Sequence, residues 1–403
     1  MSKTERPWED WIPGVLSNTQ LKIICEADFI RNVDTNSSVI DGSSIDLILS
    51  DEGYSMPKGA VKPFGGRFIS KLTEHKLVKP IKAVDDGSFL LNPEKTYLFK
   101  LRERLQFPNN SLIYGEATAK SSVGRVDVLA RLIVDGMDCY DYFNPEGLDA
   151  GIGELFIEIT SLTFHVKVRK GCSLSQLRLF FGKPSSCQVT GKEAFRCFIQ
   201  KDNDEKEDDG SLSVELSPIL IGNNSVAAFR SKKPPKDAAP IPLWEEEPPI
   251  CPDPCKYWSF IKADDMNRIK LEKGKFYIIR SKEKLKLHKG IAVNCQAIDE
   301  TLGEMRIHYA GFAHPWFGRN RSDGKIGTPL IFEVRGHDVQ TSLKDGDKMA
   351  RLSFYRMSED VKKPKTVPKK ISPYENQTLQ LSKFFSKWPD SVKVDDKGNV
   401  SPA

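Results

Sequence analysis

Two stretches of this chain recur in the same order, and this internal repetition constrains the fold more than any other feature. The segment 96–117, TYLFKLRERLQFPNNSLIYGEA, matches 276–297, FYIIRSKEKLKLHKGIAVNCQA, at positions 180 residues apart. The segment 153–177 matches 327–352 at a spacing of 175, so that Glu158 corresponds to Glu333. One such match could arise by chance between β-rich segments. Two in the same order, with nearly equal spacings, indicate a duplicated domain.

Short apolar and alternating runs predict that both copies are built from strands. Examples are IDLIL, YLFKL, SLIYG and LFIEI, which are separated by turns rich in Pro, Gly, Asn and Asp. This pattern is typical of compact β-barrels and sandwiches. A short helix is expected after Ser17, which can cap the segment NTQLKIICEADFI. We therefore predict a mainly β protein of two tandem β-barrel domains with few short helices.

Length and composition agree with a soluble two-domain protein. A chain of 403 residues exceeds the usual size of one hydrophobic core. The net charge of +5 is too small to indicate a nucleic-acid-binding surface. The polar, acidic start MSKTERPWEDW is unlike a signal peptide, and no run of 18 apolar residues predicts a membrane span. We expect a cytoplasmic protein that binds neither nucleic acid nor membranes.

The composition changes between the two copies. The stretch 201–210, KDNDEKEDDG, reads as a solvated loop, and 232–255 is rich in proline and charge, which disfavours helices and central strands. We predict four parts: a first domain at 1–184, an extended connector at 185–255, a second domain at 256–360, and a partly disordered C-terminal extension at 361–403.

The cysteines do not form a metal-binding pattern. Among the eight cysteines, only Cys251 and Cys255 lie close together, in CPDPC. A zinc site would need two further ligands at matching spacing, and none is visible. We expect reduced structural thiols and no zinc.

The stretch KSSVGR at 120–125 combines two cations with two hydroxyl groups. Arg and Lys side chains, with hydroxyls and turn N–H groups, are the usual means of holding phosphate oxygens. The alternative is the solvated edge of a strand. In the second copy, Glu300 and Met305 take the positions of Lys120 and Arg125. We therefore predict an anion-binding site in the first domain and none in the second.

Two further polar residues lie in apolar surroundings. Glu158 stands between Ile157 and Ile159 in LFIEITSL. Burial there would raise its pKa and suit it to general acid–base chemistry, whereas exposure would make it an ordinary edge residue. Gln176 follows the turn at Gly171 in RKGCSLSQL, where the simpler interpretation is an ordinary β-turn feeding a strand.

Taken together, KSSVGR, LDAGIGELFIE and RKGCSLSQLRL, in this order, closely resemble the dCTP deaminase branch of the dUTPase-like superfamily. VIDGSSIDLIL resembles an early strand of that family. The two-copy layout, with GVLSNTQL near the start and GTPLIFEVRGHD near the end, resembles the long two-domain bacterial type. The resemblance covers most of the chain outside 185–255 and the tail past about 360. It implies two tandem dUTPase-like β-clip domains.

The resemblance implies an enzyme that hydrolyses a cyclic amidine C–N bond, converting dCTP to dUTP and ammonia and so supplying dUTP for thymidylate synthesis. Glu158 would be the catalytic glutamate, which takes a proton from water attacking C4 of cytosine and passes a proton to the departing ammonia. Ser121 and Arg125 would order this water and the nucleotide. No zinc is implied, and Mg²⁺ would accompany the triphosphate without protein side-chain ligands.

The remaining implied contacts are with the substrate. Phosphate would be contacted by Lys120 and Ser122, the deoxyribose 3′-hydroxyl by Asp149, and another part of the nucleotide by Gln176. Proteins of this fold usually build their sites between subunits of a trimer, so a homotrimer is expected by analogy.

The sequence also departs from related patterns. Zinc nucleobase deaminases carry H-x-E and P-C-x-x-C, and none of the six histidines here is followed by x-Glu. Relative to the dCTP deaminase pattern, the turn LDAGIGEL is one residue short and has Ile152 where an aromatic residue is usual. The insertion at 135–147 is unlike the short bacterial form.

Two other functions fit parts of the sequence. A dUTPase, or a bifunctional deaminase–dUTPase, would act on the same nucleotide, but the tail SPYENQTLQLSKFFSKWPD is not glycine-rich and LDAGIG lacks a tyrosine. A non-catalytic dNTP-binding protein is the second alternative, because the second copy has lost the cations of the first. Retention of Ser121, Arg125 and Glu158 together favours the enzyme.

Overall fold

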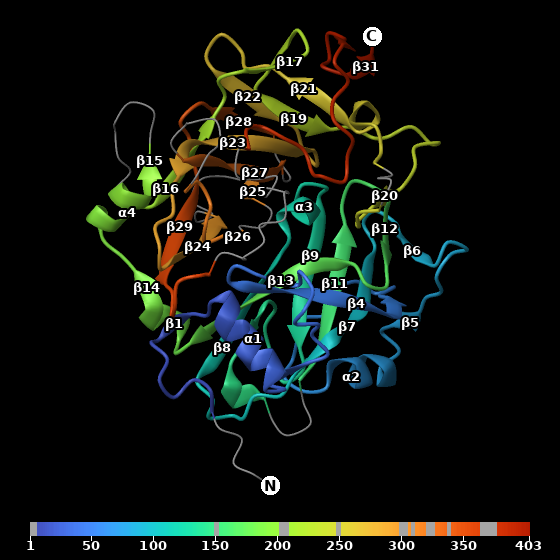
Figure 1. Ribbon diagram of the computed structural model, residues 1–403. Helices are drawn as coiled ribbons and strands as arrows, with labels where there is room; N and C mark the ends of the chain where they lie inside the picture. Colours follow the sequence, from blue (N-terminus) through green and yellow to red (C-terminus); the bar gives the residue numbers. More distant parts are fainter. Residues whose placement is uncertain are drawn as a thin grey trace.

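The computed structural model describes residues 6–148, 153–200, 209–246, 251–297, 305–307, 311–319, 327–336, 340–362 and 377–403. Most of its elements are strands, and the helices among the described residues are short: α1 (Asn18–Glu26), α2 (Phe68–Glu74), α3 (Ser121–Gly124) and α4 (Lys192–Phe198). The strands form two lobes, blue to green and green to red in Figure 1. The predicted mainly β class is confirmed.

The first lobe is built on a sheet with the strand order β10-β8-β13-β4-β7-β11-β9. Strand β4 (Ser44–Ser55) pairs with β13 near its start and with β7 near its end, and the register with β7 shifts between Leu49 and Gly53. The sheet therefore folds over along β4, as barrel-like sheets do at a bulge. The other strands are β7 (Thr96–Leu105), β8 (Ile113–Ala119), β9 (Val128–Val134), β10 (Tyr142–Phe143), β11 (Glu154–Ser161) and β13 (Ser173–Phe181).

The second lobe repeats this arrangement. Its order is β26-β24-β29-β16-β23, with β27 paired to β23 and β25 paired to β27. Strand β16 (Ser211–Glu215) is again shared between two neighbours, β29 and β23. The other strands are β23 (Phe276–Leu285), β24 (Ile291–Ala297), β25 (Met305–Ile307), β26 (Phe312–Ala313), β27 (Thr328–Gly336) and β29 (Lys348–Arg356).

Shorter strands also recur in both lobes. The pair β6–β12 of the first lobe corresponds to β22–β28 of the second, β1–β13 to β14–β29, and β2–β7 to β15–β23. The short strands are β1 (Gly14–Val15), β2 (Ile30–Arg31), β3 (Ile40–Asp41), β5 (Lys79–Pro80), β6 (Ser88–Leu91), β12 (Val166–Arg169), β14 (Gln188–Val189), β15 (Ile199–Gln200), β17 (Ile219–Ile221), β18 (Asn224–Val226), β19 (Ala228–Ser231), β20 (Ile241–Pro242), β21 (Trp258–Ile261), β22 (Arg268–Leu271), β28 (Thr341–Lys344), β30 (Val392–Val394) and β31 (Val400–Pro402).

A buried carboxylate occupies the same place in both copies. Glu103 accepts a hydrogen bond from the Ile48 N–H at 2.9 Å, and Glu283, 180 residues later, accepts one from the Ser213 N–H at 2.6 Å. The first of these hydrogen bonds joins β4 to β7, and the second joins β16 to β23. The duplication inferred from the sequence is therefore present in the strand order and in individual side-chain contacts.

Residues 185–255 differ from the predicted connector. They contain β14–β20 and α4, and the short run Ser211–Glu215 forms β16 in the middle of the second sheet. Leu212 and Val214 are fully buried there. The proline-rich part, by contrast, does run along the boundary between the lobes, where β20 pairs in parallel with β12. The acidic and proline-rich composition of the flanks hid this strand from sequence reasoning.

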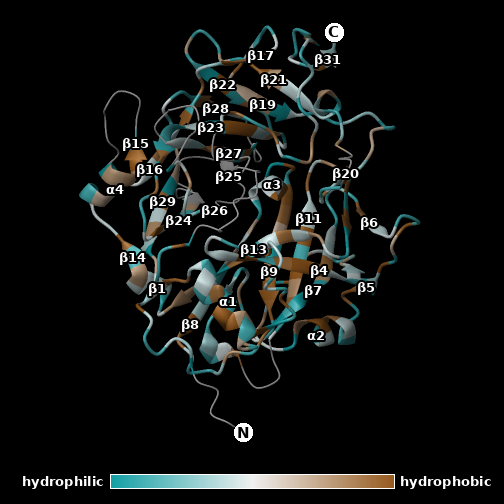
Figure 2. Ribbon diagram, viewed as in Figure 1, coloured by the Kyte–Doolittle hydropathy of each residue, from teal (hydrophilic) through white to brown (hydrophobic). Residues whose placement is uncertain are grey.

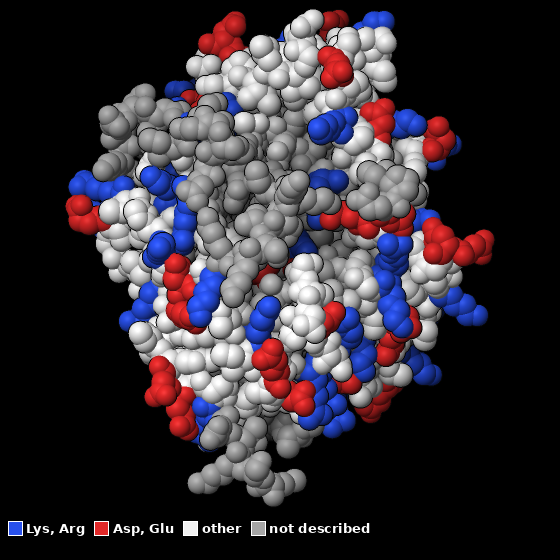
Figure 3. Space-filling model, in the orientation of Figure 1, with Lys and Arg blue, Asp and Glu red and all other residues white. Residues whose placement is uncertain are grey.

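One hydrophobic core extends from the first lobe across the boundary into the second lobe, which also has a separate core of its own. Phe164 of the first lobe lies 5.6 Å from Tyr257 and Trp258 of the second and 6.4 Å from Phe385, measured between ring centroids. Figure 2 shows the hydrophobic residues concentrated on the inner strands, including β4, β9 and β11. Figure 3 shows positive and negative side chains interspersed over the visible face, without a broad field of one sign.

The C-terminal residues 377–403 pack on this core. Leu379, Phe384 and Phe385 are buried, and β30 pairs with β31 close to the end of the chain. Residues 390–403, expected to be disordered, therefore have a defined hairpin. No helix among the described residues is long and apolar enough to cross a membrane.

Candidate active site

The stretch KSSVGR follows β8 directly: Lys120 precedes the one-turn helix α3, and Arg125 ends it. The Lys120 N–H bonds to the Leu174 carbonyl at 2.9 Å, which anchors the turn to strand β13. Val123 is fully buried and holds α3 on the core, and Arg125 follows with only 2% of its surface exposed. We call Lys120, Ser121, Ser122 and Arg125 the lip.

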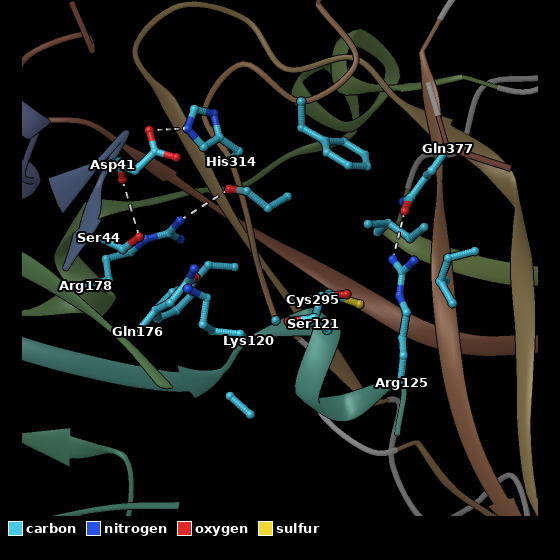
Figure 4. A pocket seen from close by; sticks show the side chains of 18 of the residues that line it. Asp41, Ser44, Lys120, Ser121, Arg125, Gln176, Arg178, Cys295, His314 and Gln377 are labelled. Atoms are coloured by element: carbon cyan, nitrogen blue, oxygen red, sulfur yellow. Dashed lines mark hydrogen bonds and ion pairs between the residues drawn. The ribbon is translucent and has the colours of Figure 1, made fainter. Parts of the chain in front are cut away.

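All four lip residues and Gln176 line one cavity of about 280 Å³ at the boundary between the lobes. Figure 4 shows Lys120, Ser121 and Gln176 close together, with Arg125 extending past the end of α3. The first lobe also contributes Asp41, Ser44, Asp46 and Arg178, and the second lobe contributes Cys295, Phe312, Ala313, His314, Phe332 and Glu333. The predicted anion-binding residues are therefore gathered in one place, and both halves of the chain enclose it.

Among the described residues, the carboxylates that line this cavity are Asp41 and Asp46 of the first lobe and Glu333, on β27 of the second. Glu333 Oε1 lies 3.9 Å from Arg125 Nε, and both side chains are almost completely buried. The fit requires Gly124, because a Cβ atom at that position would lie 2.1 Å from Glu333 Oε2. Within the described part of the chain, Glu333 Oε2 has no hydrogen-bond partner. A buried oxygen of this kind is suited to accept a hydrogen bond from a ligand or water.

The surroundings of Glu333 favour its protonated form. Burial raises the pKa of Glu333 well above its ordinary value, the negative charge of Asp127 raises it further, and Arg125 acts in the opposite direction. A carboxyl group whose pKa is moved toward neutrality can accept a proton and return it.

Glu158 on β11 does not line this cavity. Its Oε2 accepts a hydrogen bond from the Tyr140 hydroxyl at 3.1 Å, and it lies opposite Arg131 on β9. The Arg131 guanidinium lies 4.7 Å from the centre of the Tyr140 ring and also pairs with Asp141. Burial raises the pKa of Glu158 too, but the lip is not its neighbour in this chain. The geometry therefore favours Glu333 over the predicted Glu158.

Two family models match the chain, one in each half. Residues 12–183 match the family model of the 2′-deoxycytidine 5′-triphosphate deaminase N-terminal domain, and residues 188–385 match that of the C-terminal domain. Together the two models span most of the chain.

The chain belongs to the dCTP deaminase family.

A solved dCTP deaminase has the same two-domain structure. The crystal structure of 2′-deoxycytidine 5′-triphosphate deaminase from Agrobacterium tumefaciens superposes with a TM-score of 0.75 at 25% sequence identity. The match covers 87% of this chain and 97% of the other. The predicted two-domain type is thus confirmed. No curated protein matches the sequence.

The other residues of this dCTP deaminase family member that were predicted to contact substrate have the following positions. Lys120 pairs with Asp46 at the edge of the cavity, and Gln176 lies opposite Asp46 on the adjoining strand. Ser122 is 3% exposed, and its carbonyl accepts a hydrogen bond from Ser382 at 2.7 Å. The predicted sugar contact, Asp149, lies outside the described residues.

The C-terminal segment closes one side of the cavity. The Gln377 side chain accepts a hydrogen bond from Arg125 at 2.8 Å and donates one to the Pro329 carbonyl at 2.7 Å. Gln377 therefore links the lip to the start of β27, the strand that carries Glu333. Lys383 from the same segment also lines the cavity.

Sequence reasoning missed Glu333 and Gln377. A signal for Glu333 was present, since it matches Glu158 in the repeat. The turn before Glu158 is one residue shorter than the family pattern, and Asp323 precedes Glu333 by one residue more than Asp149 precedes Glu158. Gln377 had no comparable signal, because its position depends on the path of the C-terminal segment. Among the described residues, no group of three or more His, Cys, Asp and Glu side chains forms a candidate metal site.

Proposed function

We propose that this chain converts dCTP to dUTP and ammonia by zinc-independent hydrolysis in the cavity between its lobes. The observation that supports this function is the convergence of the lip with the buried carboxylate of Glu333. The lip offers cations and hydroxyls for the phosphates, and Glu333 offers a group able to exchange protons.

Glu333 would be the general base and then the general acid. Its carboxylate takes a proton from water as the water oxygen bonds to C4 of cytosine. The C4–N4 bond then breaks, Glu333 gives its proton to the departing nitrogen, and ammonia leaves. The raised pKa of Glu333 and its hydrogen-bonding oxygen next to Gly124 support this double role.

Lip residues would hold water and nucleotide in register with Glu333. Arg125, 3.9 Å from the carboxylate, is placed to orient it, and Ser121 would hydrogen-bond the attacking water. Lys120 and Ser122 would contact phosphate, and Gln176 another part of the nucleotide. Holding the reacting groups in position before the reaction can lower the activation free energy by roughly 7–11 kcal/mol at most.

Magnesium would enter with the substrate, chelated by the triphosphate, since it neutralises charge that the lip's two cations cannot. The carboxylates of the first lobe at the cavity have cationic or imidazole partners: Asp46 pairs with Lys120, and Asp41 with His314 at 3.1 Å. This pairing supports binding of the metal through the nucleotide. The product dUTP would serve a later reaction that makes thymidylate.

The test compares two matched variants, Glu333→Gln and Glu158→Gln. We expect Glu333→Gln to lower ammonia release from Mg²⁺-dCTP by roughly 10²–10⁴-fold, the usual contribution of a general acid–base group, while nucleotide binding persists. Glu158→Gln, at the matching position of the first copy, should retain most of the rate. Products from dCTP, dCMP, CTP and dUTP are identified by chromatography.

A large loss in Glu158→Gln with a normal rate in Glu333→Gln would contradict the assignment of Glu333. Conversion of dUTP to dUMP and pyrophosphate would indicate the bifunctional activity. Tight nucleotide binding without any product would indicate a dNTP-binding protein that has lost catalysis.

A further inference from the structure

A second cavity, of about 570 Å³, lies on the boundary between the lobes. Its first-lobe side includes Glu94, Thr163 and His165, and its second-lobe side includes Lys275 and Arg335. The loop 232–239, which leads into β20, forms the rest of the wall. Neither the lip nor Glu333 is part of this lining, so the cavity is separate from the candidate active site.

The lining of the second cavity has one dominant charge. A single carboxylate, Glu94, faces five cationic side chains, those of Lys232, Lys233, Lys236, Lys275 and Arg335. The face visible in Figure 3, by contrast, mixes both signs. Such a concentration of cations around a hollow attracts anions with several charges.

Three of the four lysines of this cavity form no ion pair with an acid in the described part of the chain. In the described ranges, no carboxylate forms an ion pair with Lys233, Lys236 or Lys275. Lys232 donates to the Val400 carbonyl at 3.3 Å, and burial lowers its pKa, while Cys255, Asp395 and Asp253 act in the opposite direction. Buried or clustered cations without counter-charges are costly, and a bound anion would relieve that cost.

The loop that carries three of these lysines is held in place from both lobes. Its start is fixed by the Lys232 N–H, which bonds to the Tyr257 carbonyl at 2.9 Å. Its end is fixed by the Ile241 N–H, which bonds to the His165 carbonyl of the first lobe at 2.9 Å. Pro234 and Pro235 restrict the loop between these anchors. The cavity is therefore preformed, as ligand sites usually are.

Arg335 connects the second cavity to the candidate active site. Its guanidinium lines the cavity, remains 18% exposed, and donates hydrogen bonds to the carboxylate of Asp127 and to Thr163. Asp127 is two residues after Arg125 in the chain, and Arg335 is two residues after Glu333 on β27. The Asp127–Arg335 pair thus holds β27 to the segment that follows α3, next to the contact between Arg125 and Glu333.

We propose that this basic cavity binds a polyphosphate, either free or as part of a nucleoside triphosphate, and regulates the candidate active site through Arg335. The proposed regulation rests on the proposed function, whereas the proposed binding of polyphosphate does not. A polyphosphate would compete with Asp127 for the Arg335 guanidinium.

Binding of a polyphosphate should change the pKa of Glu333, because it would draw the positive charge of Arg335 away from Asp127. With Arg335 drawn toward the ligand, the negative charge of Asp127 acts more strongly on Glu333, and the pKa of Glu333 rises. Less Glu333 is then ionised at a given pH, so less of the enzyme has an active base. Occupancy should therefore lower kcat, most strongly on the acidic side of the pH profile.

Calorimetry tests the binding half. Tripolyphosphate is titrated into the full-length protein at low salt, where the wild type should bind it at the lip and in the basic cavity. Lys233→Ala/Lys236→Ala should leave binding at the lip unchanged and weaken binding in the basic cavity at least tenfold, because both side chains are exposed and line the basic cavity but not the one at the lip. Lys22→Ala/Lys58→Ala removes two exposed lysines that line neither cavity and should titrate like the wild type.

ATP serves as the second probe. Tighter binding of ATP than of tripolyphosphate at the basic cavity would identify a nucleotide ligand, and equal binding a free polyphosphate; both support the site. A Lys233→Ala/Lys236→Ala variant that titrates like the wild type with both probes would overturn it.

Kinetics tests the regulatory half. At saturating Mg²⁺-dCTP, tripolyphosphate should lower kcat of the wild type severalfold, and Lys233→Ala/Lys236→Ala should be insensitive. Equal inhibition of both proteins would overturn coupling through this cavity. If no protein releases ammonia, the proposed function fails, yet the calorimetric result still decides whether the anion site exists.

Discussion

Gly124 shows how one missing side chain can shape an active site. Glu333 reaches the lip only because Gly124 has no Cβ atom, and the atom that a Cβ would displace is the end of a flexible side chain. Gly124 ends α3, so an alanine is acceptable to the backbone there and the cost would fall on the carboxylate.

We predict that Gly124→Ala folds normally but lowers kcat by about 10²-fold, because a displacement of about 1 Å in a catalytic group can have that effect. Steady-state kinetics with Mg²⁺-dCTP measures the loss, and thermal unfolding checks the fold. A wild-type rate in a normally folded Gly124→Ala protein would mean that Glu333 does not act from this position.

At the scale of residues, the sequence identified one side of the site. Lys120, Ser121, Ser122, Arg125 and Gln176 were selected from motifs, and they line one cavity. Their roles in catalysis stay predictions. The carboxylate was not selected in the same way, because the repeat offers two matching glutamates, and the one-residue difference between the turns before them does not show which lobe faces the lip.

At the scale of elements, the fold-over strands β4 and β16 define both lobes. Each is fixed to the next strand by a buried carboxylate, Glu103 in the first lobe and Glu283 in the second. Burial raises the pKa of Glu103 from 4.5 to about 7. Since the folded protein prefers protonated Glu103, this group stabilises the fold fully below about pH 4.5, and the contribution is lost as the pH rises through 7.

We therefore predict that the free energy of unfolding falls between pH 4.5 and 8, and that Glu103→Gln reduces this fall by roughly 3 kcal/mol, given about 1.4 kcal/mol for each pKa unit. Glutamine keeps an acceptor for the Ile48 N–H but does not ionise. Urea unfolding at several pH values provides the measurement. An unchanged pH dependence in the variant would show that Glu103 is ionised in the folded protein.

Strands with strong local patterns were predictable, and β16 was not. Its sequence, SLSVE, lies between acidic and proline-rich flanks, and its burial arises from pairing with β23 and β29, which are far away in the chain. Local composition therefore pointed to a connector where nonlocal pairing forms a central strand.

At the scale of the molecule, Arg178 is a principal link between the lobes. It lies on β13 of the first lobe, is 1% exposed, and donates hydrogen bonds to the Val293 carbonyl at 3.0 Å and the Ala313 carbonyl at 3.3 Å. Its guanidinium also lies 4.0 Å from the Phe312 ring centre. Burial lowers the pKa of Arg178 to about 9. The cavity depends on this contact, since Phe312 and Ala313 line it.

We predict that Arg178→Met lowers the free energy of unfolding by about 3–5 kcal/mol, because it leaves buried polar partners unsatisfied, and that activity falls with it. Arg196→Met, which removes a surface arginine paired with Glu193, should change stability by less than about 1 kcal/mol. Denaturant unfolding and kinetics measure both. Similar losses in the two variants would contradict the role of Arg178. The trimer stays a prediction, which sedimentation can test.

The duplicated β architecture, the family and the cationic lip could be inferred without a structure, because repeats, alternating patterns and short motifs are local properties of the chain. Which carboxylate meets the lip depends, by contrast, on how the two lobes pack. Glu158 and Glu333 hold matching places in their own lobes, and the packing of one lobe on the other, through contacts such as Arg178 and the shared aromatic core, brings Glu333 to Arg125. That choice depends on contacts between residues about 200 positions apart, which no local pattern encodes.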